Sequence, residues 1–307
     1  MYKLLPALLL CAAPMGAAFA QAVGPAQVRT ATPAAERATT EAPLFNPAQL
    51  SPEAFETGRG DLFVLVKRDI FSLRAEIGGG VTSNAFLSDD NRKTDTFTRQ
   101  RVSLSADTVI AGAYGVGVSV NFDASQFHNY NVLGSNAVGL RTYVMRPVSG
   151  TTIGISAGVS TLYDDSLDAH VLDQGDLHLI ALRGFALGEM TQLTLSGAIG
   201  YLRADPEDYS HLRGFAEAAV QVAPMEGLEL TGYLNATGRR YEDYFSSVFA
   251  ESRRDLTGQL GVRVRYMPHA NMILSAEFSV ASNASTIDTF DYVAAEGSGQ
   301  IGLAIRF

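Results

Sequence analysis

Cysteine is almost absent from this sequence, and its single occurrence lies outside any recognisable folded domain. Cys11 lies in a short apolar run that follows Lys3 and closes on the residues AFA. A basic residue, an apolar run and small residues around a cleavage point are typical of a secretory signal peptide. We therefore predict that residues 1–20 are a signal peptide removed before Gln21. The mature chain would then hold no cysteine, which excludes disulfides and zinc–cysteine sites.

A basic excess and long apolar runs are missing as well. The formal net charge is -9, whereas nucleic-acid binding requires clustered basic surface, so we expect no nucleic-acid partner. Beyond the signal peptide, no uninterrupted apolar stretch reaches the roughly 20 residues that a membrane-spanning helix needs. The 29 glycines against 11 prolines, without a collagen-like period, favour strands and tight turns over helices.

Motifs for catalysis and metal binding are also missing. The five histidines are scattered, without an HExxH motif or a pair at helical metal-ligand spacing. We therefore predict no metal site, no cofactor and no enzyme activity. A serine–histidine pair built from His211 and the serines at 246–247 is the one catalytic alternative that the sequence leaves open, because a hydrolase needs such a pair close together.

Residues 21–70 differ in composition from the rest of the chain. Ala, Thr and Pro dominate 21–60, and no periodicity persists there for more than a few residues. We predict that 21–70 is a flexible segment in front of the folded domain. The apolar stretch LFVLV at 62–66 is compatible with a short strand or with a plug-like segment.

From Phe71 onward the chain alternates between apolar and polar residues. Phe71, Leu73 and Ile77 fall on one face of the first such stretch, and Arg74 and Glu76 fall on the other. A period of two indicates a β-strand with one apolar and one polar face. We count twelve such segments, with the alternation blurred in the fourth and sixth. They are 71–83, 97–110, 115–126, 137–146, 152–163, 176–185, 191–203, 212–223, 228–240, 252–266, 272–282 and 298–307.

The connections between these segments alternate in length. Short turns such as PVSG, PMEG and MPHAN follow the even-numbered segments, and long polar connections follow the odd-numbered ones. A soluble β-sandwich gives no reason for this rhythm, whereas an outer-membrane barrel has short periplasmic turns and long external loops. The segments are also as long as the roughly 9–11 residues that cross a bilayer at a steep tilt. We predict an all-β, up-and-down antiparallel transmembrane β-barrel of about twelve strands over residues 71–307.

These features resemble those of Gram-negative outer-membrane β-barrel proteins of the porin-like kind. The resemblance is carried by the signal peptide, the two-residue repeat, the loop rhythm and the ending IGLAIRF. It implies an outer-membrane location, contact with lipid and lipopolysaccharide, and a periplasmic position for 21–70. It also implies that the barrel-assembly machinery recognises the alternate apolar residues of the last strand, which are Ile301, Leu303, Ile305 and Phe307.

A second resemblance is carried by GGGVTSNAF in the first strand and by SRRDLTGQLGVRVRYMPHANMILSAEFSVASNASTIDTFDY near the end. These stretches look like those of porin-like barrels that accompany polysaccharide export or surface-protein assembly. This resemblance implies that residues 21–70 contact a periplasmic export partner.

The polar faces of the strands are expected to line the interior of the barrel. Arginine offers planar, bidentate donors, so an arginine-containing lumen would guide anionic solutes. We therefore expect a porin-like channel for small hydrophilic solutes or ions. Paired charges that only fill and stiffen the barrel are an equal alternative, and a non-conducting component of an export complex is another. The candidate lumen residues are Arg74, Arg99, Arg101, Arg141, Arg213, Arg263, Arg265, Glu76, Asp107, Asp123, Glu217, Asp255 and Glu277.

Overall fold

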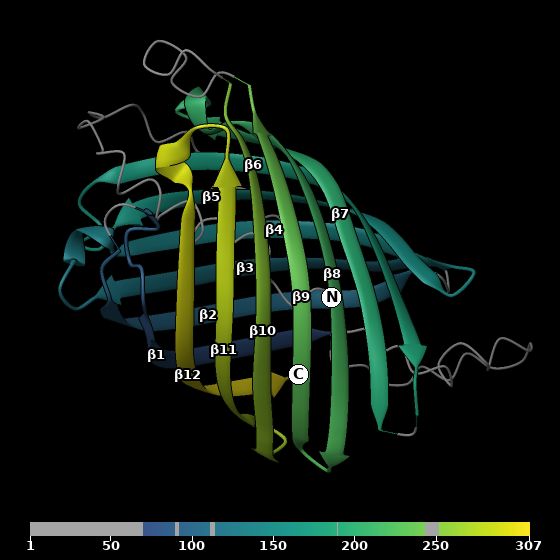
Figure 1. The fold of residues 1–307 in the computed structure, drawn as a ribbon. Helices are drawn as coiled ribbons and strands as arrows, with labels where there is room; N and C mark the ends of the chain where they lie inside the picture. The colour runs from purple at the N-terminus through teal and green to yellow at the C-terminus, as the bar shows by residue number, and fades with distance from the viewer. Residues whose placement is uncertain (1–69, 90–91, 111–113, 189, 243–251) are drawn as a thin grey trace, which may run out of the picture.

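The computed structural model describes residues 70–89, 92–110, 114–188, 190–242 and 252–307. Within these residues, twelve antiparallel strands form a closed barrel in which each strand pairs with its neighbours in sequence (Figure 1). The predicted architecture and strand count are confirmed. The predicted signal peptide, the segment 21–69 and the serines at 246–247 lie outside the described residues. No helix in the described part of the chain is long and apolar enough to cross a membrane.

Short 3-10 turns accompany the strands at one end of the barrel. They are η2 (Asn131–Leu133), η3 (Glu207–Tyr209) and η4 (Asp288–Phe290). The strands are β1 (Phe71–Thr82), β2 (Asp95–Ile110), β3 (Tyr114–Phe127), β4 (Ser135–Val148), β5 (Thr151–Asp164), β6 (His170–Ala186), β7 (Thr191–Asp205), β8 (His211–Met225), β9 (Leu228–Tyr241), β10 (Arg254–His269), β11 (Met272–Ser285) and β12 (Tyr292–Arg306).

Two strands begin much earlier than the sequence pattern predicts. β6 starts at His170 and β12 at Tyr292, six residues before the predicted starts at 176 and 298. The ladder continues there, for example between Leu162 and Leu172. In β6 the exposed His170 and Asp173 interrupt the apolar alternation. In β12 the small residues Ala294, Ala295 and Gly297 give little contrast between the two faces.

The two faces of each strand have opposite character. Side chains on the outer face are apolar and exposed, such as Ile77 at 60% and Leu260 at 62% of their surface. Side chains on the inner face are polar and buried, such as Ser103 at 5% and Asp123 at 2%. An apolar exterior around a polar interior suits a barrel whose outer surface faces lipid. Closure satisfies the backbone donors and acceptors, as a hydrocarbon environment requires.

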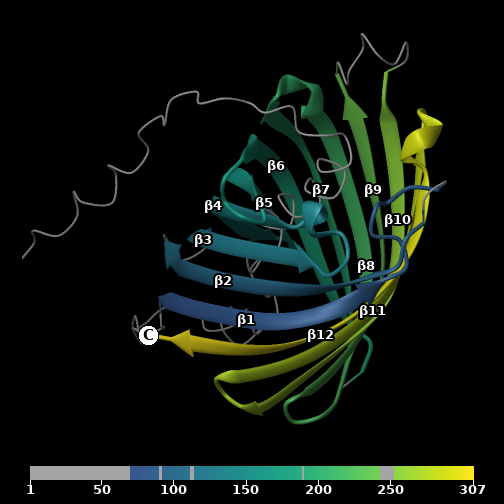
Figure 2. The ribbon, with the colours of Figure 1, turned by 90° about the vertical axis from the view of Figure 1, so that its left-hand side faces the viewer.

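Long and short connections lie at opposite ends of the barrel (Figure 2). The turn between β4 and β5 contains only residues 149–150, and Gly150 there adopts a positive φ of 79°. By contrast, twelve residues, 83–94, separate β1 from β2. The predicted rhythm of short connections after even-numbered strands and long ones after odd-numbered strands is confirmed.

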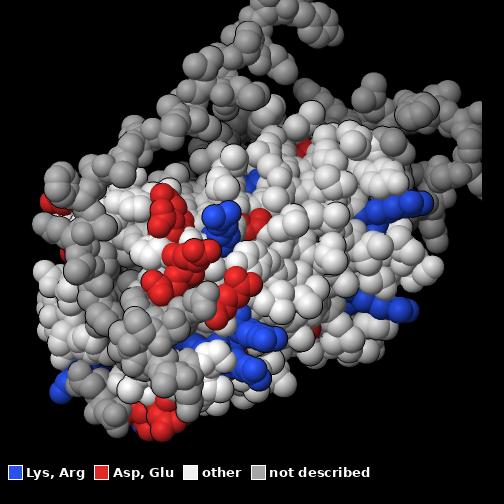
Figure 3. Space-filling view, turned by 90° about the horizontal axis from the view of Figure 1, so that it is seen from above, with Lys and Arg blue, Asp and Glu red and all other residues white. Residues whose placement is uncertain are grey.

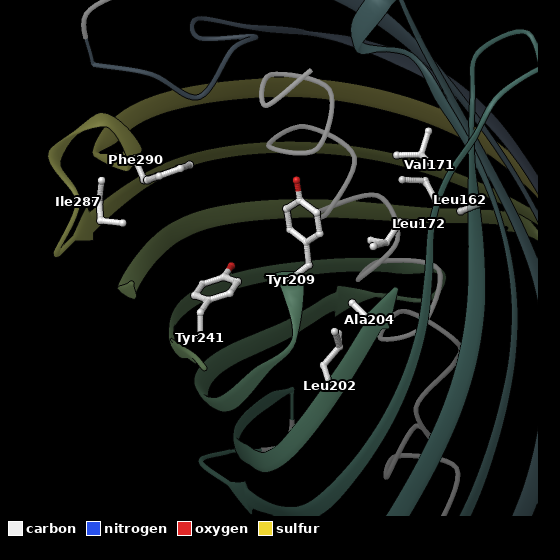
Figure 4. Packing of buried hydrophobic residues seen from close by; sticks show 10 residues of the cluster. Leu162, Val171, Leu172, Leu202, Ala204, Tyr209, Tyr241, Ile287 and Phe290 are labelled. Atoms are coloured by element: carbon white, nitrogen blue, oxygen red, sulfur yellow. The ribbon is translucent and has the colours of Figure 1, made fainter. Parts of the chain in front are cut away.

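Apolar side chains gather inside the barrel at the end with the long connections (Figure 4). Tyr209 comes from η3 and Phe290 from η4, so the 3-10 turns contribute to the cluster as well as the strands. The guanidinium of Arg253 lies 3.6 Å from the ring centroid of Phe290 and 4.6 Å from that of Tyr241. We call this group the mouth cluster. Its members are Ala137, Leu162, Val171, Leu172, Leu202, Ala204, Tyr209, Tyr241, Ile287 and Phe290.

The barrel is closed by the pairing of β1 with β12, at whose short-turn end Phe71 and Phe307 meet. The backbone N–H of each residue donates to the carbonyl of the other, with an N···O distance of 3.0 Å in both directions. Their rings stack with centroids 5.8 Å apart. Phe307 therefore forms part of the seam that joins the first strand to the last.

We predict that Phe307→Ala lowers the fraction of protein that assembles in the outer membrane several-fold. The substitution removes the stacked ring at the seam and the terminal aromatic residue that assembly is expected to recognise. Heat-modifiable electrophoretic mobility of the membrane fraction measures the assembled fraction. Phe278→Ala is the control, because Phe278 is an outward aromatic residue on β11 that is 53% exposed. Equal losses in both variants would contradict a special role for Phe307.

Candidate channel lumen

All thirteen predicted lumen residues lie on the inner face of the barrel. Each alternates along its strand with outward side chains, as Glu76 does between Ala75 and Ile77. On the surface seen in Figure 3, acidic and basic side chains gather in adjacent groups toward one side, and much of the remaining surface is uncharged. The candidate residues themselves are distributed over β1 to β4, β8, β10 and β11, and their role in selecting a solute stays a prediction.

The most deeply buried ion pair joins β4 to β6 across β5. Arg141 Nη2 donates to both carboxylate oxygens of Asp176, at 2.5 and 2.8 Å. The Arg141 side chain is 4% exposed and that of Asp176 is 1% exposed. Arg141 also donates to the hydroxyl of Ser156, and His178 Nδ1 lies 3.5 Å from the same carboxylate. Both side chains are almost inaccessible to solvent, so the pair ties β4 to β6 within the wall.

Three further pairs lie on the inner wall toward the mouth cluster. Arg101 donates to Asp123 through Nη2 at 2.7 Å and through Nε at 3.0 Å. Arg253 is bound to Asp255 in the same way, with its Nη2 at 2.6 Å from the carboxylate. The third pair joins Arg99 on β2 to Glu296 on β12, with 3.7 Å between nitrogen and oxygen. In each of these pairs an arginine and a carboxylate balance one another in charge.

A more open group of charges lies on β1 and on β9 to β11. Arg263 Nε donates to Glu277 at 2.7 Å, and the two side chains are 46% and 28% exposed. Arg265 on the same strand lies 4.0 Å from Glu229, and Arg74 lies 2.5 Å from Glu76.

We call these six residues, Arg74, Glu76, Glu229, Arg263, Arg265 and Glu277, the open charge group. With the exception of Glu76, their side chains are more exposed than those of the Arg141–Asp176 pair. The pair of Arg99 and Glu296 is exposed to a similar extent, at 20% and 35%.

The remaining candidates are held by neutral partners or by the wall itself. Asp107 accepts hydrogen bonds from the Tyr143 hydroxyl and from Ser105 Oγ, the latter at 3.2 Å. Gly117 leaves the space for this contact, because a Cβ there would lie 2.5 Å from the Tyr143 ring. Arg213 on β8 is 9% exposed, and Glu217 lies opposite Asn235 on β9.

The inward side chains along most of β5 and β7 are small and neutral. Those of β7 are Thr194, Ser196, Ala198, Gly200, Leu202 and Ala204. Those of β5 are Thr152, Gly154, Ser156, Gly158, Ser160 and Leu162. The charge on this part of the wall is the buried pair of Arg141 and Asp176, which reaches across β5.

Several residues of this wall were not predicted. Asp176, Glu296 and Tyr143 lie on inner faces, and two of them complete pairs with predicted arginines. The sequence pattern starts the sixth strand only at Asp176 and leaves Glu296 in a loop. In the structure both strands begin earlier, which places both carboxylates on the inner wall. Tyrosine is treated as an apolar residue when apolar and polar positions are counted along a strand, so the alternation does not identify Tyr143 as a polar residue of the inner face.

A cluster that could bind a metal ion is absent from the described residues. They contain no group of three or more His, Cys, Asp or Glu that could hold a metal ion. His211 lies on the inner face beside the mouth cluster, where its Nδ1 is 2.8 Å from the carbonyl oxygen of Tyr209. The serines predicted as its alternative partners lie outside the described residues.

Comparison with solved structures identifies the architecture. The COG4313 outer membrane channel from Pseudomonas putida F1 aligns over 77% of this chain and 96% of its own, with a TM-score of 0.54 and 11% identity. The fold is that of an outer-membrane β-barrel. This barrel also aligns with the β domain of the Bordetella autotransporter BrkA at 12% identity, over 78% of this chain and 100% of that one, with a TM-score of 0.44. No protein-family model and no curated protein matches the chain.

We predict that Asp176→Ala destabilises this barrel by about 3–5 kcal/mol, because it leaves the buried Arg141 guanidinium without its counter-charge. Unfolding by urea in lipid vesicles, followed by electrophoretic mobility, measures the free energy of unfolding. The control is Asp89→Ala, which breaks an exposed pair with Arg92 and is expected to change stability by less than about 1 kcal/mol. Equal losses in the two variants would contradict a structural role for the buried pair.

Proposed function

We propose that this protein is an outer-membrane channel through which small hydrophilic solutes or ions pass passively. The observation that carries the proposal is the polar inner wall, which contrasts with the apolar exterior on every strand. Barrels of about eight strands are filled by their own side chains, and those of about 16–18 enclose a channel. Twelve strands lie between these limits, which fits a narrow pore. The P. putida structure that shares the fold is described as an outer membrane channel.

The open charge group is the proposed electrostatic filter. Its arginines and acids occur in equal number, so the field in the lumen is balanced and the expected selectivity between anions and cations is weak. Removing the charge of one member of a pair would give the lumen a net charge of the opposite sign at that place. The buried Arg141–Asp176 pair contributes to the wall and not to selection.

Single-channel recording of the purified, refolded full chain in a planar bilayer tests both parts of the proposal. Stepwise conductance is expected, and its absence would refute the proposal that the protein is a channel. In a salt gradient, Arg263→Gln should shift the reversal potential toward cation preference, because Glu277 is left uncompensated. Glu277→Gln should shift it the opposite way. The control is Arg183→Gln, which alters an outward arginine that packs over the ring of Phe185 at 4.9 Å.

The recordings also discriminate the alternatives. If the full chain is silent and a periplasmic protein co-purifies with it through residues 21–70, the barrel is a non-conducting component of an export complex. Phospholipid hydrolysis that is lost in His211→Ala would instead indicate a barrel-borne hydrolase. Shifts of the reversal potential in the same direction in Arg263→Gln and Glu277→Gln, or no shift in either, would refute the filter while leaving the channel intact.

A further inference from the structure

Tyr233 on β9 contacts both members of the charged pair that Arg263 forms with Glu277. Its hydroxyl donates to Glu277 Oε1 at 2.5 Å, while Arg263 Nε donates to Oε2 at 2.7 Å. The Arg263 guanidinium also lies 5.7 Å from the centroid of the Tyr233 ring, which is within the range of a cation–π contact. Tyr233 itself is buried. One buried neutral residue therefore holds an anion and a cation of the open charge group.

The hydrogen bonds around Tyr233 fix the direction in which its hydroxyl donates. Gln259 Nε2 donates to the Tyr233 oxygen at 3.2 Å, and Asn235 Nδ2 donates to Gln259 Oε1 at 3.2 Å. Because the hydroxyl accepts from Gln259, its own proton is directed toward Glu277. This arrangement holds Glu277 Oε1 against the wall and leaves Oε2 for Arg263.

A glycine on the neighbouring strand makes room for the tyrosine ring. Gly261 on β10 is the ladder partner of Tyr233, and a Cβ there would collide with Cζ and with the hydroxyl oxygen of the tyrosine. The side chain of Tyr233 thus passes over β10 and reaches Glu277 on β11. A larger residue at position 261 would displace the ring.

The same construction occurs a second time in the barrel, with a different set of partners. Tyr143 on β4 passes over its ladder partner Gly117 on β3 and donates to Asp107 on β2. Asp107 also accepts from Ser105 Oγ at 3.2 Å. These partners of Asp107 are neutral, whereas Glu277 is shared between a tyrosine and an arginine. Tyr143 is therefore a built-in reference for what such a tyrosine does without an arginine beside it.

We propose that Tyr233 is a positioning residue that sets how much negative charge Glu277 presents to a solute in the lumen. The inference rests on the proposed channel and its electrostatic filter. With the hydroxyl in place, both carboxylate oxygens are bound and the charge is held at the wall. Without the hydroxyl, Oε1 turns toward water in the lumen, and Arg263 loses the ring that supports its guanidinium. The anion then faces passing ions more directly.

The size of the expected effect follows from Coulomb's law. In water, bringing a unit charge from about 7 to about 4 Å from a passing ion changes the relative occupancy by that ion about twofold. We therefore expect Tyr233→Phe to raise the ratio of cation to anion permeability about twofold, in the same direction as Arg263→Gln.

Reversal potentials of the full chain in a salt gradient test the proposal through a double-mutant cycle. Tyr233→Phe should shift the potential in the unchanged background. In the Glu277→Gln background it should cause no further shift, because an amide carries no charge to reposition. Tyr143→Phe is the matched control, and any effect that it has should be the same in both backgrounds.

Gly261→Ala tests the same position without altering a polar group. The added Cβ displaces the ring, so this variant should reproduce the shift of Tyr233→Phe and should lose it in the Glu277→Gln background. The control is Gly232→Ala, because Gly232 faces outward on β9 and a Cβ there meets no atom within 4 Å. Heat-modifiable mobility verifies that each variant is folded.

The recordings separate a failed positioning role from a failed channel. Stepwise conductance with an equal shift for Tyr233→Phe in both backgrounds, or with no shift in either, would overturn the positioning role and leave the channel standing. A shift in Gly232→Ala as large as that in Gly261→Ala would also overturn it. Absence of conductance would refute the channel.

A chemical measurement reads the position of Arg263 without conduction. Phenylglyoxal modifies arginine side chains, and peptide mass spectrometry of the folded, treated protein gives the rate for Arg263. Tyr233→Phe should raise this rate, because the guanidinium loses its support, and Tyr143→Phe should leave it unchanged. Equal rates in the two variants would contradict the positioning role of Tyr233, whatever the recordings show.

Discussion

The pairing of β1 with β12 is the constraint on which the rest of the structure depends. Eleven residues of β1, from Ser72 to Thr82, are in register with eleven of β12, from Arg306 back to Glu296. In hydrocarbon an unpaired strand edge would leave backbone groups unsatisfied at a cost of several kcal/mol each. The same register decides which side chains face inward. A slip by one residue would turn the arginines to the lipid and the leucines to the lumen.

The sequence was sufficient to predict the class of fold, because the decisive signals are local. Alternation over ten or more residues and the rhythm of short and long connections both follow directly from the geometry of a closed, two-faced sheet. The start of β6 was mispredicted because the exposed His170 and Asp173 interrupt the alternation, and that of β12 because its first residues are mostly small. The ladder from His170 and from Tyr292 is held by backbone pairing, which does not require an apolar outer face.

The lumen was predicted in part. Period-two counting identified the inward arginines, yet it could not identify their partners, which are set by register across strands. Arg141 meets Asp176 two strands away and Arg99 meets Glu296 across the seam. The mouth cluster was missed for a related reason. Most of its residues come from strand ends and 3-10 turns that lie far apart in sequence and outside the predicted strands, whereas Ala137, Leu162 and Leu202 lie at the ends of predicted strands.

The pairing of charges changes the physical description of the inner wall. An arginine ladder suggests a strongly positive conduit, whereas the structure has carboxylates beside most of the arginines. A polar inner wall with a weak electric field is compatible with the proposed channel, because water and uncharged solutes interact with hydrogen-bonding groups and do not require a net charge.

The mouth cluster makes the two ends of the barrel mechanically unequal. At the short-turn end the strands are held by their ladders and by the lipid around them. At the other end the strands also carry a buried apolar layer on their inner side, from Leu162 and Leu172 to Tyr241 and Phe290. Opening the rim at this end exposes that layer to water, with a loss of about 1.5–3 kcal/mol for each large side chain. We therefore expect the strands to separate first at the short-turn end, where Phe71 and Phe307 meet, when the barrel is unfolded by force or denaturant. The end with the long connections is expected to unfold last.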